Sequence, residues 1–155
     1  YGIACSIGLT TKSLFTEKIS AINQEINKPQ VKFTFLLGFD TLVRLFDPKY
    51  YPNQSISSAL KPLFANSSFF ILSRNDEKYP QEEQEKYIEK IERGEFKNDI
   101  PSEWTRHLFL VRGDGTSLNI SSSEIRAMIN GGQEKWKKYT YADIIGYITD
   151  HNMYV

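Results

Sequence analysis

Apolar segments typical of buried strands alternate along this chain with segments of helical periodicity. The runs VKFTFLL (31–37), SFFILSR (68–74) and HLFLVR (107–112) are nearly continuous and rich in aromatic and aliphatic residues. Parallel strands buried on both faces favour this pattern. A smaller apolar run, IACSIGL (3–9), precedes them. Because strands and helices alternate, we expect an α/β fold: a parallel sheet with helices on both faces.

The segments between these strands carry helix signals. Thr11 or Ser13 can cap a first helix, whose apolar face would be Leu14, Phe15, Ile19, Ile22 and Ile26. A short helical run, TLVRLF (41–46), ends at Asp47-Pro48, and another follows near 56–64, interrupted at Pro62. The highly charged segment 79–96 is predicted to be a helix with a solvated face, and 140–154 is predicted to be a terminal amphipathic helix.

Polar and glycine residues follow each strand at its carboxyl end. They are GFD (38–40), SRND (73–76) and RGDGTSLNISSSEIR (112–126). In open parallel sheets, ligands bind beyond the carboxyl ends of the strands, so this convergence favours a nucleotide site. For GFD, the alternative is a simple strand-to-helix turn with Asp40 as the N-cap. Arg74 at a strand end can touch phosphate, whereas Asp76 and Glu77 are read as solvated loop charges.

The stretch SLNISSSEIRAMINGG (117–132) supports two interpretations. Ser121 and Glu124 fit a capping box, which would make the segment a well-capped amphipathic helix. A helix N-terminus also attracts anions, and serine hydroxyls with the Arg126 guanidinium would add phosphate donors.

Bulk properties exclude several classes of protein. The 155 residues suffice for a single domain, residues 1–155. Basic and acidic residues balance at 19 each, which argues against broad binding to nucleic acid or to an anionic membrane. No apolar run reaches the ~20 residues of a membrane span. Cys5, the one cysteine, indicates a reducing setting, cytoplasmic or nuclear, and is expected to be a small core residue.

Two motifs together resemble nicotinamide mononucleotide adenylyltransferases. LLGFDTLVRLFDPKYYP (36–52) resembles the Gly-x-Asp segment of that family, in which an aromatic residue follows about a dozen residues later. NISSSEIR (119–126) resembles the Ile-Ser-Ser-Thr/Ser-x-x-Arg signature. The likeness covers most of the chain and is strongest to the divergent fungal branch. It implies a Rossmann-like nucleotidyltransferase fold.

The resemblance implies roles for matching residues. Gly38 would let the backbone approach the nucleotide, and Asp40 would accept hydrogen bonds from ribose hydroxyls. Tyr51 stands where the family has a ring, usually tryptophan, that stacks on nicotinamide, with Tyr50 beside it. The phosphates of ATP, with Mg²⁺, would be held by Ser122, Ser123 and Arg126. Arg126 would also be the catalytic residue that stabilises charge on the leaving pyrophosphate. Arg112 and Asn119 are weaker candidates, and both tyrosines can instead be packing residues.

One family element is not present. The family has a His-x-x-His pair after its first strand, and neither His107 nor His151 stands in such a motif. We read His107 as structural and His151 as exposed. The chain begins at Tyr1 in what reads as a strand, so we expect the C-terminal portion of a nucleotidyltransferase domain whose N-terminal part is missing here.

The resemblance therefore implies an enzyme that transfers AMP from ATP to nicotinamide mononucleotide, giving NAD and pyrophosphate. Alternatives stay open. They are another nucleotidyltransferase, such as a phosphopantetheine adenylyltransferase, a non-catalytic nucleotide-binding protein, and a domain without a ligand.

Overall fold

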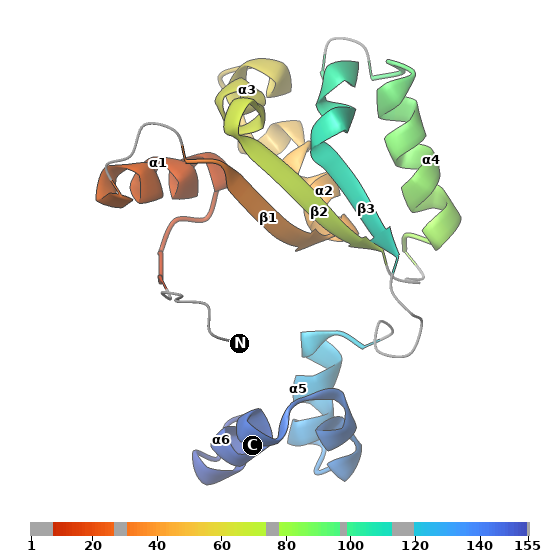
Figure 1. The fold of residues 1–155 in the computed structure, drawn as a ribbon. Helices are drawn as coiled ribbons and strands as arrows, with labels where there is room; N and C mark the ends of the chain where they lie inside the picture. The colour runs from red at the N-terminus through yellow and green to blue at the C-terminus, as the bar shows by residue number, and fades with distance from the viewer. Residues whose placement is uncertain (1–7, 27–30, 74–77, 97–98, 113–119, 155) are drawn as a thin grey trace.

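The chain folds around a small parallel sheet. The computed structural model describes residues 8–26, 31–73, 78–96, 99–112 and 120–154. Three parallel strands in the order β1-β2-β3 alternate with helices, as Figure 1 shows, and this confirms the predicted α/β, Rossmann-like class. The strands are β1 (Phe33–Gly38), β2 (Ser67–Ser73) and β3 (Leu108–Arg112). The α-helices are α1 (Phe15–Ile26), α2 (Phe39–Leu45), α3 (Ile56–Asn66), α4 (Gln81–Glu92), α5 (Ser122–Asn130) and α6 (Ala142–Asp150).

Strand register brings the carboxyl ends of the strands to one edge of the sheet. Gly38 at the end of β1 pairs with Leu72, and Ser73 at the end of β2 pairs with Arg112 at the end of β3. The segment after each strand therefore starts from the same edge, as expected for a sheet of this kind.

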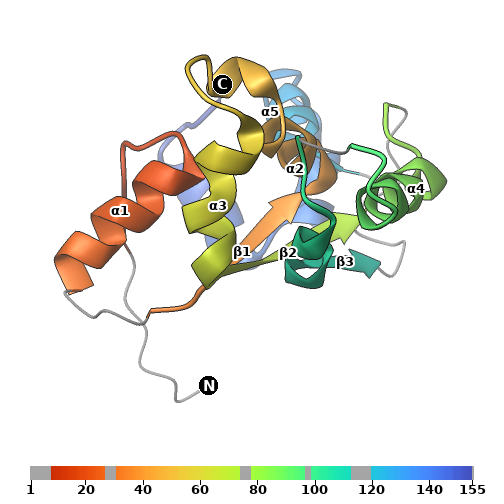
Figure 2. The same ribbon diagram turned by 90° about the horizontal axis from the view of Figure 1, so that it is seen from above.

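One face of the sheet is buried. Phe69 and Ile71 of β2 are fully inaccessible to solvent, and α2 and α3 contact the strands on this side. Figure 2 shows the helices layered against the strands. Near the amino ends of the strands, Phe64 stacks on Trp104 with ring centroids 4.1 Å apart, and Phe46 extends the stack. Phe46, Phe64 and Trp104 all belong to the buried core.

The opposite face of the sheet is apolar and exposed. Its side chains alternate with the buried ones along the strands, and they are Leu36, Phe70, Leu72, Phe109 and Val111. Leu36 is 82% exposed. No helix layer covers these side chains among the described residues, although parallel sheets in folded proteins are usually covered on both faces.

The last two α-helices form a second, smaller cluster. Ile129 of α5 and Trp136 of a 3₁₀ segment, η3 (Glu134–Tyr139), are buried, but neither belongs to the core of the sheet. In Figure 1 this C-terminal unit lies apart from the sheet.

Three short 3₁₀ segments were not predicted. They are η1 (Pro48–Tyr50), η2 (Ser102–His107) and η3. The expected interruption at Pro62 is also wrong, because α3 runs continuously from Ile56 to Asn66. Pro62 has no N–H group to donate to the carbonyl of Ser58. Both residues are exposed, so water can bind that carbonyl instead. None of the helices in the described ranges has the length and apolar character needed to cross a membrane.

Two adjacent phenylalanines of β2 test which face of the sheet supports the fold. Phe69 is 0% exposed and Phe70 is 38% exposed. We expect Phe69→Ala to lower the free energy of unfolding by about 3–5 kcal/mol, because it opens a cavity in the core. The matched change Phe70→Ala should lower the free energy of unfolding by about 1 kcal/mol or less. Urea denaturation of both variants checks this, and equal losses would contradict the one-sided core.

Candidate functional site

The turn between β1 and α2 places a carboxylate at the edge of the sheet. Gly38 is both the last residue of β1 and the N-cap of α2, and it makes no side-chain cap bond. Asp40 lies within the first turn of the helix, so the alternative reading of Asp40 as the N-cap is wrong. A Cβ atom at Gly38 would lie 2.8 Å from Oδ1 of Asp40. A side chain at position 38 would therefore displace the end of the Asp40 side chain from this position.

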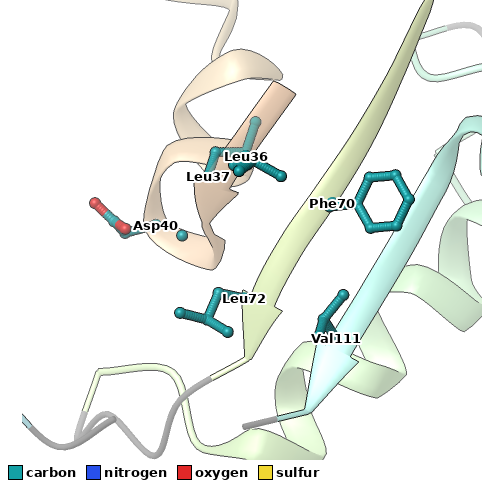
Figure 3. A pocket seen from close by; sticks show the side chains of 7 residues that line it. Leu36, Leu37, Asp40, Phe70, Leu72 and Val111 are labelled. Atoms are coloured by element: carbon teal, nitrogen blue, oxygen red, sulfur yellow. The ribbon is translucent and has the colours of Figure 1, made fainter. Parts of the chain in front are cut away.

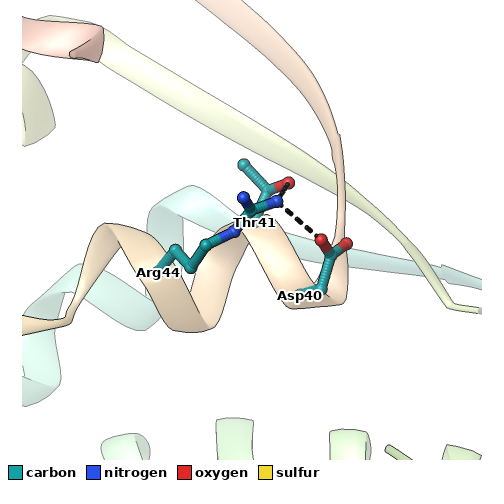
Figure 4. Close-up of polar contacts among 3 residues, drawn as sticks. All are labelled: Asp40, Thr41 and Arg44. Atoms are coloured by element: carbon teal, nitrogen blue, oxygen red, sulfur yellow. Dashed lines mark hydrogen bonds and ion pairs between the residues drawn. The ribbon is translucent and has the colours of Figure 1, made fainter. Parts of the chain in front are cut away.

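Arg44 holds the other side of the Asp40 carboxylate. Its Nη2 atom donates to Oδ2 of Asp40 at 2.7 Å and lies 3.4 Å from Oγ1 of Thr41 (Figure 4). Asp40 and Arg44 are four residues apart on α2, the spacing at which helix side chains meet. Both side chains are largely exposed, so we read the pair as fixing orientation more than as adding stability.

A cavity of about 630 Å³ lies over the exposed face of the sheet, next to this turn. Figure 3 shows side chains from all three strands around it, with Asp40 at one rim. Its walls are mostly the apolar residues Leu36, Leu37, Phe70, Leu72 and Val111. Such a surface can accept a flat apolar group, while the carboxylate offers hydrogen-bond acceptors at the edge.

A second cavity, of about 320 Å³, lies on the other side of α2 and contains both predicted tyrosines. Tyr51 is 8% exposed, and its hydroxyl donates to the carbonyl oxygen of Leu45 at 3.0 Å. Tyr50 is 38% exposed, and the ammonium group of Lys49 lies 4.9 Å from the centroid of its ring. Of the two rings, Tyr50 is the one with more surface available to a ligand.

The remaining walls of this tyrosine cavity come from two helices. The first turn of α1 supplies Phe15 and Lys18, and α2 supplies Thr41 and Arg44. Arg44 therefore lines the tyrosine cavity while binding Asp40 at the rim of the other one. The two cavities share α2 as a common wall.

The serine helix, α5, has the predicted capping box. The hydroxyl of Ser121 accepts from the backbone N–H of Glu124 at 3.2 Å, and the Glu124 carboxylate accepts from the N–H of Ser121 at 2.6 Å. Ser122, Ser123 and Arg126 are exposed, and Nη2 of Arg126 donates to the hydroxyl of Ser123 at 3.1 Å. The guanidinium group thus lies over the first turn of α5.

The secondary candidates have other surroundings. Arg112 forms an ion pair with Glu85 of α4 at 2.6 Å and lines neither of the two cavities. His107 packs edge-on against Phe64, and burial lowers its pKa. The exposed His151 stacks on Tyr147 in α6. Cys5, Arg74, Asp76, Glu77 and Asn119 lie outside the described residues, as does most of the strand expected at 3–9.

The structure thus brings the Gly38–Asp40 turn together with the two tyrosines, through α2. Arg126 and its serines lie on α5, in the C-terminal unit. Sequence reasoning missed Arg44 and Lys18. The spacing of Asp40 and Arg44 on one helical face could have revealed the first, but nothing in the sequence places Lys18 beside the tyrosines. Within the described ranges, no three His, Cys, Asp or Glu side chains gather as a metal site.

The chain resembles one protein of fission yeast along nearly its whole length. It is 32% identical over 146 residues to a Schizosaccharomyces pombe protein named "Putative nicotinamide mononucleotide adenylyltransferase". The match covers 92% of this chain and 57% of the relative, so the chain spans little more than half the length of the protein it matches. No protein-family model matches the chain.

The Tyr51 hydroxyl provides a test of the tyrosine cavity. We expect Tyr51→Phe to lower the free energy of unfolding by about 1–2 kcal/mol, because the carbonyl of Leu45 loses its buried donor. Tyr50→Phe, at the exposed neighbour, should change it by less than about 0.5 kcal/mol. Denaturant titration of both variants at neutral pH measures the difference. Equal effects would show that the Tyr51 hydroxyl is not buried against Leu45.

Alkaline pH should weaken the same region. Burial, with a smaller contribution from the charge of Tyr50, raises the pKa of Tyr51 from 10.0 to about 12. The folded state therefore holds its proton more tightly than the unfolded state, and this stabilisation is lost as the pH rises from about 10 to about 12. Unfolding midpoints measured across this range should fall less steeply in Tyr51→Phe than in the wild type. Parallel slopes would contradict the raised pKa.

Proposed function

We propose that the full-length protein is a member of the nicotinamide mononucleotide adenylyltransferase family and that this chain supplies part of its nucleotide site. The proposal rests on the observation that α2 lies between two cavities, one bordered by Asp40 of the Gly38–Asp40 turn and the other lined by Tyr50 and Tyr51. The name of the fission yeast relative supports the same reaction class. The reaction would transfer AMP from ATP to nicotinamide mononucleotide and release pyrophosphate.

Asp40 would bind ribose hydroxyls. Arg44 occupies Oδ2, which leaves Oδ1, above the bare Cα of Gly38, to accept from a sugar. A carboxylate fixed in advance binds with a smaller entropy loss than one that must be ordered by the ligand.

The tyrosine cavity would hold the pyridine ring of the acceptor nucleotide. Tyr50 would provide the exposed ring face, and Tyr51 would keep the wall in place through its bond to Leu45. The two tyrosines would therefore differ in role: Tyr50 would contact the ligand, and Tyr51 would support the wall of the cavity.

Ser122, Ser123 and Arg126 would bind the phosphates of ATP. The first backbone N–H groups of a helix have no hydrogen-bond partner within the helix. In α5, the N–H of Glu124 donates to the hydroxyl of Ser121. A triphosphate would meet the neighbouring N–H groups, the two serine hydroxyls and the guanidinium group. Mg²⁺ would arrive bound to that triphosphate and neutralise part of its charge.

In the chemical step, a phosphate oxygen of the acceptor nucleotide attacks the α-phosphorus of ATP. The new P–O bond forms as the bond to the bridging oxygen of the β-phosphate breaks, and pyrophosphate leaves with that electron pair. Arg126 would stabilise the charge that grows on the leaving group. The protein's main contributions would be alignment of the two nucleotides and charge stabilisation.

The test is an assay of the full-length protein with ATP, Mg²⁺ and nicotinamide mononucleotide, with NAD measured directly. Arg126→Ala should lower kcat/KM by about a hundredfold or more. It should change the free energy of unfolding by about 0.5 kcal/mol or less, because Arg126 is exposed. Arg93→Ala is the matched control, an exposed arginine that pairs with Glu89 on α4, and it should retain full activity.

Three outcomes would count against this proposal. Full activity in Arg126→Ala would show that Arg126 does not act on the phosphates. A loss of folding in that variant would show that Arg126 is needed for the structure. ATP binding without any NAD formation would favour another acceptor, such as a phosphopantetheine, or a nucleotide-binding protein that lacks catalysis.

A further inference from the structure

The tyrosine cavity has an unbalanced charge. Two cationic side chains, Lys18 and Arg44, line it, and no carboxylate does among the described residues. Arg44 is neutralised by Asp40 at 2.7 Å. Lys49, which lies over the ring of Tyr50, is likewise neutralised by Asp47 at 2.7 Å.

Lys18 has no such partner in the part of the chain that the structure describes. Its ammonium group lies 5.0 Å from the centroid of the Phe15 ring, in the wall of the cavity. The nearest acid on the same helix, Glu17, turns its carboxylate to the backbone N–H of Leu14 at 3.2 Å. The side chain of Lys18 is half-buried, so the surrounding water screens its charge less than it would at a fully exposed site.

The other walls suit a small aromatic ring. Phe15, Leu14, Leu45 and Tyr50 provide apolar and aromatic surface, and the hydroxyl of Thr41 provides a polar contact. A cavity of about 320 Å³ is at the lower end of ligand pockets, which run from roughly 300 to 1,000 Å³. It is large enough for one substituted ring and too small for a whole dinucleotide.

The charge of Lys18 discriminates between two pyridine nucleotides. The ring of a pyridine ribonucleotide is a cation. With a carboxamide substituent the ring brings only positive charge toward Lys18, and like charges repel. With a carboxylate substituent, the ring brings an acceptor that can form a charge-assisted hydrogen bond with the ammonium group.

We propose that Lys18 selects a pyridine nucleotide carrying a ring carboxylate, so that the preferred acceptor is nicotinate mononucleotide and not its amide. This inference rests on the proposed function for the identity of the reaction, and it assigns the acceptor. Lys18 acts as a specificity-determining residue, which binds the substituent of the ring and takes no part in the transfer of AMP.

The experiment compares kcat/KM for the two acceptors in the full-length protein with ATP and Mg²⁺. We expect nicotinate mononucleotide to be preferred by about tenfold or more, as expected for one hydrogen bond to a charged group. Lys18→Met should lower kcat/KM for the acid about tenfold and raise that for the amide slightly, because it removes the repulsion between Lys18 and the cationic ring. Lys18→Glu should reverse the preference. Lys12→Met, at an exposed lysine of the preceding segment that does not line the cavity, should behave as the wild type.

Two results would overturn the inference: a wild-type preference for the amide, or an equal loss with both acceptors in Lys18→Met. Calorimetric binding of nicotinate mononucleotide alone separates this inference from the proposed reaction. If neither acceptor is turned over but the wild type binds the acid about tenfold more tightly than Lys18→Met does, the proposed reaction fails and the role of Lys18 stands. If the acid binds both proteins equally or not at all, the role of Lys18 fails.

Discussion

The direct passage from β1 into α2 is the constraint on which the candidate site depends. The strand ends at Gly38 and the helix begins at Phe39, with no loop between them. Phe39 is buried against Tyr79 and Tyr87, with ring centroids 5.4 and 5.5 Å away. The contact with Tyr87 joins the start of α2 to α4, and parallel pairing fixes Gly38 opposite Leu72. The position of Asp40 is therefore set by the core and the sheet, and not by the conformation of a loop.

The seven residues of α2 serve the core and the surface at once. Phe39, Leu42 and Leu45 are buried on one side of the helix. On the other side, the ion pair between Asp40 and Arg44 connects the rim of one cavity with the wall of the next. A ligand that draws Asp40 away from Arg44 would leave a second unbalanced cation in the tyrosine cavity.

The sequence predicted what depends on local pattern and missed what depends on tertiary packing. The three strands of the sheet, the main helices and the capping box of Ser121 and Glu124 are explained by apolar periodicity and cap residues, and all are confirmed. The segment around Trp104 has no regular apolar period, and it becomes ordered because Trp104 stacks on Phe64. Lys18 reaches the tyrosines only through the packing of α1, which no local pattern encodes. The phosphate and ribose roles stay predictions.

The capping box and a phosphate site at α5 are compatible because they use different atoms. Capping consumes the Ser121 hydroxyl, the Glu124 carboxylate and one backbone N–H. Ser122, Ser123 and Arg126 take no part in it and remain exposed, with the guanidinium group already turned toward the first turn. A stable cap fixes the direction of the free N–H groups, which is what an anion site at a helix end requires. The Glu124 carboxylate acts against such a site, since it brings negative charge to the same end and weakens the field that a phosphate would meet. Arg126 would offset that charge, so the affinity of the proposed phosphate site would depend on the arginine more than on the helix dipole.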